Sequence, residues 1–101
     1  RKSSTIWYGP YETAPEGNYT AVYRLKTGNH TLTGVILLDA RTRGETLANT
    51  TVDASRLPEG RWHDIILEFS NDAVSTDLEL RGILLSGYTD VRLDRVRLTQ
   101  R

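Results

Sequence analysis

Cysteine and methionine are both missing from this chain of 101 residues. Without cysteine, no disulfide, no thiolate metal ligand and no thiol nucleophile is available. Long hydrophobic runs are missing too: the longest is Val35-Ile36-Leu37-Leu38, far short of the roughly 20 apolar residues that cross a membrane as a helix. We therefore expect no direct membrane insertion. Because position 1 is not methionine, we also expect the segment to be excised from a longer polypeptide.

An excess of charge of one sign is also absent. Lysine plus arginine and aspartate plus glutamate number 13 each, so no field over the whole chain attracts a polyanion. Nucleic acid is therefore not an expected partner. A chain of this length forms one core, which predicts a single module over residues 1–101.

What the chain does have is alternation of apolar and polar residues. Within residues 18–26, one face carries Tyr19, Ala21, Tyr23 and Leu25. Residues 33–40 are apolar on both faces, which is typical of a central strand, and residues 45–52 are polar and threonine-rich, which suits an edge strand. Such period-two patterns, separated by turns, predict an all-β protein.

The second half of the chain continues this pattern. The strongest core predictions are Ile65, Leu67 and Phe69 within residues 62–70, followed by Leu78, Leu80 and Leu84 within residues 78–85. In the last strand the spacing slips by one between Leu93 and Val96, which predicts a β-bulge near Asp94-Arg95. With a first strand over residues 5–13, about seven strands result, and we predict an antiparallel β-sandwich of jelly-roll type.

Four segments in this order resemble the galactose-binding-like β-sandwich domains, which include the family 6 and family 35 carbohydrate-binding modules. The segments are "GNYTAVYRL", "GRWHDIILEF", "DLELRGILLSG" and "DVRLDRVRL". The resemblance implies a non-catalytic accessory module that binds a polysaccharide or oligosaccharide beside other domains of its parent chain. It also implies a structural calcium ion between the first and last strands, for which Asp94 and Glu12 are the matching residues.

The first candidate site is the aromatic cluster in "WYGPYETAPEGNY". Proline within a strand indicates an edge or a bulge, where aromatic residues commonly close the open end of a sandwich. The first interpretation is therefore packing. The alternative is that Trp7 or Tyr8 stands exposed as a stacking platform for a sugar ring.

A second group of candidates comes from loops and strand ends. Tyr88 and Asp90 lie in a loop before the last strand, and loops carry function on rigid scaffolds. Trp62 opens a strand, where it either binds a ligand or protects a sheet edge, and Asn29 in a turn offers hydrogen bonds to sugar hydroxyls. For each aromatic residue, packing over the end of the sandwich is the competing interpretation.

Motifs for catalysis and for transition metals are not found. The sequence has no Gly-x-Ser-x-Gly elbow, phosphate loop or His-Glu-x-x-His, so we expect no enzyme. His30 and His63 lack companions at ligand spacing, so no zinc site is expected. Asp90 with Asp94 offers two carboxylates near a loop, a weak indication of calcium, which takes six or more oxygen ligands. Calcium in a structural role is therefore the one cofactor to consider.

Three of the four asparagines, Asn18, Asn29 and Asn49, lie in Asn-x-Thr sequons. If they are used, the protein is a glycoprotein displayed outside the cytoplasm. Two hypotheses follow for an extracellular or cell-surface protein. The first is a carbohydrate-binding accessory module, and the alternative is a structural, glycosylated surface-layer or filament module that assembles with other protein chains.

Overall fold

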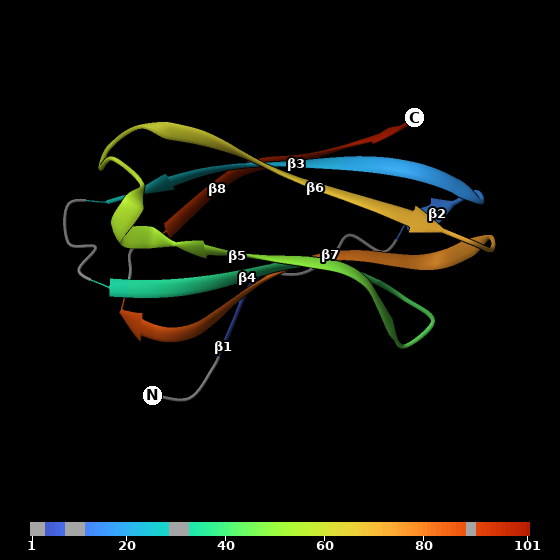
Figure 1. Ribbon diagram of the computed structural model, residues 1–101, viewed down its shortest axis with the longest axis horizontal. Helices are drawn as coiled ribbons and strands as arrows, with labels where there is room; N and C mark the ends of the chain where they lie inside the picture. Colours follow the sequence, from blue (N-terminus) through green and yellow to red (C-terminus); the bar gives the residue numbers. More distant parts are fainter. Residues whose placement is uncertain (1–3, 8–11, 29–32, 89–90) are drawn as a thin grey trace.

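The protein is a β-sandwich of two antiparallel sheets, seen as two layers in Figure 1. The computed structural model describes residues 4–7, 12–28, 33–88 and 91–101, and for residues 4–7, 12, 33 and 86–88 it describes the backbone alone. Within these ranges the chain forms eight strands and one short 3₁₀ turn. None of the described residues belongs to a helix long and apolar enough to span a membrane.

The larger sheet has the strand order β1-β7-β4-β5, and β2 also pairs with β7. Its strands are β1 (Ser4–Trp7), β2 (Glu12–Ala14), β4 (Thr33–Thr42), β5 (Glu45–Asp53) and β7 (Ser75–Tyr88). The doubly apolar β4 lies between β7 and β5, and the threonine-rich β5 lies at the edge. Both placements confirm the predictions from composition, because a central strand is covered on both faces and an edge strand is not.

The smaller sheet has the order β6-β3-β8, with β3 (Gly17–Thr27) at its centre between β6 (Trp62–Asn71) and β8 (Val91–Gln100). The pairing of β3 with β8 shifts where Arg24 opposes Arg95 while Leu25 opposes Leu93. Asp94 is therefore the extra residue of a β-bulge. The bulge predicted from the spacing of apolar residues is confirmed.

The core lies between the two sheets and follows the period-two pattern. The inward side chains of β3 are fully buried or nearly so, and the ring of Tyr19 stacks on Phe69 with centroids 5.4 Å apart. Leu67, Phe69, Leu78, Leu80 and Leu84 are buried as predicted, whereas Ile65 is partly buried and packs against the core.

A buried polar link joins the layers near the centre of the sandwich. The Tyr23 hydroxyl donates to the main-chain oxygen of Asp39 in the opposite sheet at 3.0 Å. Burial, and then the Asp39 carboxylate, raise the pKa of Tyr23 far above its ordinary value, so the ring stays neutral. The Asp39 side chain is 2% exposed and accepts two bonds from Arg81, one of them at 2.8 Å from Nε. This bidentate pair satisfies a charge that burial alone would penalise.

Two strand assignments and one short turn differ from the sequence-based predictions. The single first strand expected over residues 5–13 is described as two strands, β1 and β2, and β7 is longer than residues 78–85. The 3₁₀ turn η1 (Ala54–Arg56) was not predicted. It is stabilised by Asp53, whose side chain accepts from the Ser55 amide at 3.0 Å and from its hydroxyl at 2.7 Å.

Candidate binding surface

The outward face of the three-stranded sheet carries most of the candidate chemistry. The inward residues of β3 are buried, so its alternate residues, and those paired with them on β6 and β8, point to solvent. We call this surface the basic face and define it by Thr20, Val22, Arg24, Lys26, Trp62, Asp64, Ile66, Glu68, Arg92, Arg95, Arg97 and Thr99, with Asp94 in the bulge.

Trp62 lies at one end of the basic face, directly opposite Lys26 in the pairing of β6 with β3. Its side chain is 38% exposed. The Lys26 ammonium lies 5.4 Å and the Arg24 guanidinium 5.7 Å from the centre of the ring. Cations at these distances are attracted to the electron-rich face of an indole, so Trp62 is an exposed aromatic group framed by hydrogen-bond donors.

Beside Trp62 the face carries a small ion-pair network centred on Arg24. Its Nε is 3.4 Å from the Asp94 carboxylate, and its Nη1 is 3.6 Å from the Asp64 carboxylate. Asp94 also lies 4.0 Å from Arg95. Exposed ion pairs of this kind each contribute about 0–1 kcal/mol, so the network positions side chains more than it stabilises the fold.

Two pairs of like charges oppose each other across β3 and β8. Arg24 faces Arg95, and Lys26 faces Arg92. Asp94 lies within ion-pair distance of both members of the first pair. The second pair has no carboxylate partner among the described residues. Like charges directly opposite in a sheet are destabilising, so Lys26 and Arg92 form an unbalanced positive site next to Trp62.

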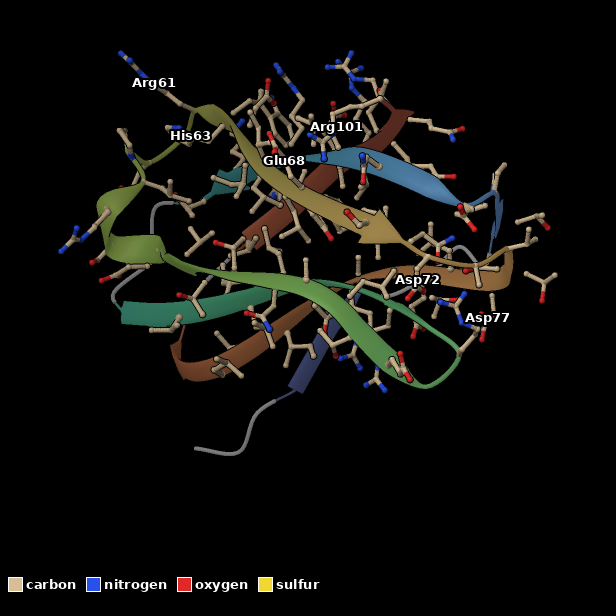
Figure 2. All side chains as sticks on the ribbon, turned by 45° about the vertical axis from the view of Figure 1, so that its right-hand side comes forward. Arg61, His63, Glu68, Asp72, Asp77 and Arg101 are labelled. Atoms are coloured by element: carbon tan, nitrogen blue, oxygen red, sulfur yellow. The ribbon has the colours of Figure 1, made fainter. Side chains whose placement is uncertain are left out.

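The strand order brings several chain connections to the same end of the sandwich, which we call the Trp62 end. Here β3 ends at Thr27, β4 begins at Thr33, β7 ends at Tyr88, and β8 begins at Val91. The segment from η1 to Trp62 closes the same end, where the Gly60 amide donates to the Thr27 carbonyl at 2.9 Å. In Figure 2, Arg61 and His63 mark this end.

The predicted sugar-binding residues are described to different extents. Trp62 lies at the exposed position given above. Tyr88 ends β7 opposite Thr33, and Trp7 ends β1 opposite Gly82. For these two residues the structure describes the backbone and not the side chain. Tyr8, Asn29 and Asp90 lie outside the described residues, although the strands that flank positions 29 and 90 end at the Trp62 end. Trp7 pairs within the larger sheet, on the other layer from Trp62.

The residues predicted to bind calcium do not come together in the described part of the chain. The Asp94 carboxylate lies between two arginines on the basic face, and these cations oppose the binding of a further one. Glu12 pairs with Leu78 in the larger sheet, and its side chain is outside the described set. No group of three metal-ligating side chains occurs among the described residues.

The sequon asparagines also differ in placement. Asn18 and Asn49 are exposed, on β3 and β5 respectively. The Oδ1 atom of Asn18 accepts a bond from the Ser70 hydroxyl at 2.7 Å. Asn49 lies on the edge strand of the larger sheet, and Asn29 is outside the described residues.

The opposite end of the sandwich, which we call the hairpin end, holds a polar cluster that the sequence reading missed. The β4–β5 turn is Arg43-Gly44, both with positive φ (53° and 74°), as a tight hairpin turn requires. The Arg43 guanidinium donates to Asn71, to the Ala73 carbonyl and, at 2.6 Å, to the Ser75 hydroxyl. This side chain thereby ties the β4–β5 turn to the β6–β7 turn.

Asp77 completes the link between the two turns. Its carboxylate accepts from the Thr42 hydroxyl at 2.6 Å and from the Arg43 amide at 3.2 Å. The hydrogen bond from Thr42, then that from the Arg43 amide, hold the pKa of Asp77 below its ordinary value. Figure 2 shows Asp77 and Asp72 at this end, far from Arg61. Its charged groups serve the fold.

His63, which has no metal-ligand companion at suitable spacing in the sequence, forms a hydrogen bond. Its Nε2 lies 3.2 Å from the Pro58 carbonyl, within the loop that precedes β6. The residues that the sequence reading missed are Arg24 and Lys26, which frame Trp62. Their alternation out of the core was visible, but their position beside Trp62 depends on strand register.

Comparisons with protein-family models, curated proteins and solved structures gave no match for this chain.

Proposed function

We propose that this chain is a non-catalytic carbohydrate-binding module of an extracellular or cell-surface protein, and that its sugar site is the Trp62 end of the basic face. The observation that carries the proposal is the exposed indole of Trp62 beside Lys26 and Arg24. An aromatic plane offers apolar contact to the C–H face of a sugar ring. Ammonium and guanidinium groups donate hydrogen bonds to ring hydroxyls.

The rigidity of the surroundings supports the same proposal. Trp62 starts a ten-residue strand paired along its whole length with β3, and the loop before it is fixed to Thr27 by the Gly60 amide. A binding group held in this way loses little conformational freedom when a ligand binds.

The test is calorimetric titration of the folded chain with a panel of soluble oligosaccharides, followed by the Trp62→Ala variant. We expect at least one sugar to bind, and we expect Trp62→Ala to weaken that binding by about five- to 150-fold, taking the roughly 1–3 kcal/mol of base–aromatic stacking as the guide. Val74→Ala is the matched control: Val74 is 66% exposed but lies at the hairpin end. A broad panel without any binding, or equal binding by Trp62→Ala, would contradict the proposal.

A second candidate function, assembly with other protein chains, is favoured by one observation. Ile66 is 59% exposed and lies beside the half-buried Val22 on the same face, and apolar surface exposed on a sheet face favours contact with another protein. Sedimentation at rising concentration separates the two functions. Assembly predicts association that Ile66→Ser abolishes, whereas the sugar site predicts a monomer whose binding Ile66→Ser leaves intact.

A further inference from the structure

The pairing of β3 with β8 leaves one positive charge pair uncompensated beside the exposed tryptophan. Lys26 lies between Trp62 on one side and Arg92 on the other, in a single row across the three strands. In the next row, Arg24 and Arg95 are bridged by Asp94 at 3.4 and 4.0 Å. The two rows thus have the same like-charge arrangement, and among the described residues only the second has a carboxylate.

The basic face carries more cations than carboxylates, although the full chain has equal numbers of both. The basic face carries five cations, Arg24, Lys26, Arg92, Arg95 and Arg97, against three carboxylates, Asp64, Glu68 and Asp94. The full chain has equal numbers of both signs. The positive charge is therefore concentrated on one sheet face, and a concentrated field attracts anions even when the net charge is zero.

The side chains of Lys26 and Arg92 form no ion pair within the part of the chain that the structure describes. Arg92 is exposed and has no hydrogen bond or ion pair among the described residues. Lys26 contacts the Trp62 ring. Opposed like charges in a sheet cost stability, and an anion bound between them would relieve that cost.

We propose that Lys26 and Arg92 form a subsite for an acidic group, a carboxylate or a sulfate, on the sugar that stacks on Trp62. The inference rests on the proposed carbohydrate function and specifies its ligand class as acidic polysaccharides. Arg92 offers a planar guanidinium for two parallel hydrogen bonds to the anion, and Lys26 supplies a point charge. Trp62 supplies the apolar contact that a small inorganic anion would not use.

The experiment compares matched sugars with and without charge. Oligogalacturonate is titrated against its methyl ester, and a chondroitin sulfate oligosaccharide against its desulfated form, at two salt concentrations. We expect the acidic member of at least one pair to bind at least tenfold more tightly, with the advantage falling as salt rises. The first pair tests a carboxylate and the second a sulfate.

Single-residue variants then show which side chains cause the preference for acidic sugars. Lys26→Gln and Arg92→Gln should each reduce the acidic preference about tenfold, because a charge-assisted hydrogen bond is worth roughly 1.5 kcal/mol or more. Arg97→Gln is the matched control: it removes the same charge from the same strand, but Arg97 faces Val22, two residues along β3 from Arg24. A normal unfolding transition in each variant keeps the comparison valid.

The outcomes separate the inference from the function on which it rests. Equal, Trp62-dependent binding of charged and neutral sugars would overturn the acidic subsite and leave the carbohydrate function standing. No binding of any sugar would overturn both. Binding of single-stranded DNA as tight as that of the acidic sugars, unaffected by Trp62→Ala, would show unspecific attraction of polyanions and would also overturn the subsite.

Discussion

The two ends of the sandwich use their charged residues in opposite ways. At the hairpin end, Arg43 and Asp77 form several hydrogen bonds that tie the β4–β5 turn to β7. At the Trp62 end, Lys26 and Arg92 face each other without a carboxylate among the described residues. The strands β4 to β7 run from one end of the sandwich to the other. The different use of charged residues at the two ends therefore does not follow from the strand topology. The charged groups of the hairpin end thus stabilise the fold, while the Trp62 end has cations without a carboxylate partner in the described part of the chain, which is the contrast on which the proposed ligand site rests.

The largest expected effect is at the hairpin end. Asn71 is buried, and its amide nitrogen donates to the carbonyls of Ala14 and Pro15 at 3.3 and 3.2 Å. Asn71→Ala removes both of these bonds and those that its side-chain oxygen accepts from Arg43 and Ser75, and we expect a loss of about 2–4 kcal/mol in the free energy of unfolding. Urea denaturation measures it. Asn49→Ala, at an exposed asparagine, should stay within about 0.5 kcal/mol of wild type, and equal losses in the two variants would contradict the contrast.

Arg43 has two roles at the hairpin end: its guanidinium donates hydrogen bonds, and its backbone adopts the left-handed conformation that the turn requires. We expect smaller effects from substitutions that separate these two roles. Arg43→Ala removes the guanidinium bonds but retains a side chain at φ 53°, and we expect it to destabilise by about 1–2 kcal/mol. Arg43→Gly removes the same bonds but relieves the left-handed conformation, so it should be about 0.5–1 kcal/mol more stable than Arg43→Ala. Denaturation of both variants gives the difference, and a glycine variant less stable than the alanine variant would show that the turn is not strained.

Acid should weaken the hairpin end through Asp77. Hydrogen bonding from Thr42 lowers its pKa in the folded state, so between the folded and unfolded pKa values the unfolded chain binds more protons. The stabilisation is complete above about pH 4 and is lost as the pH falls through the folded pKa. Asp77→Asn should therefore be less stable at neutral pH and lose less stability on acidification. An acid slope identical to that of wild type would refute this role of Asp77.

The smallest effect has the opposite sign and belongs to the Trp62 end. Arg92→Gln removes one member of a like-charge pair, so we expect the protein to gain a few tenths of a kcal/mol. Salt near 1 M should abolish the gain, since it screens exposed charges. Denaturation with and without salt tests this. If Arg92→Gln is instead destabilising at low salt, Arg92 has a structural partner and the comparison between the ends is weakened.

Much of the fold could be predicted because burial in a sheet has a period of two. Tyr19, Ala21, Tyr23 and Leu25 alternate in the sequence and are all buried, and the slip between Leu93 and Val96 located the bulge at Asp94. The polar character of residues 45–52 marked β5 as an edge strand. These patterns depend only on residues close together in the chain, so they can be recognised in a single sequence.

The candidate site was harder to predict because it depends on register. Trp62 was identified from the sequence, but its neighbours Arg24 and Lys26 lie more than thirty residues earlier in the chain. Only the pairing of β3 with β6 brings them to the indole ring. The same holds for Asn71, whose amide nitrogen donates to the carbonyls of Ala14 and Pro15, more than fifty residues earlier in the chain. Side-chain partners across strands are set by the fold as a whole.

The central claim is that a ligand binds at the Trp62 end and not at the hairpin end. Chemical-shift mapping of backbone amides during titration with oligogalacturonate tests it most directly. The account predicts shifts concentrated at Lys26, Trp62 and Arg92, with Arg43 and Asn71 unchanged. Shifts centred on Arg43 and Asn71, or none at saturating sugar, would contradict it.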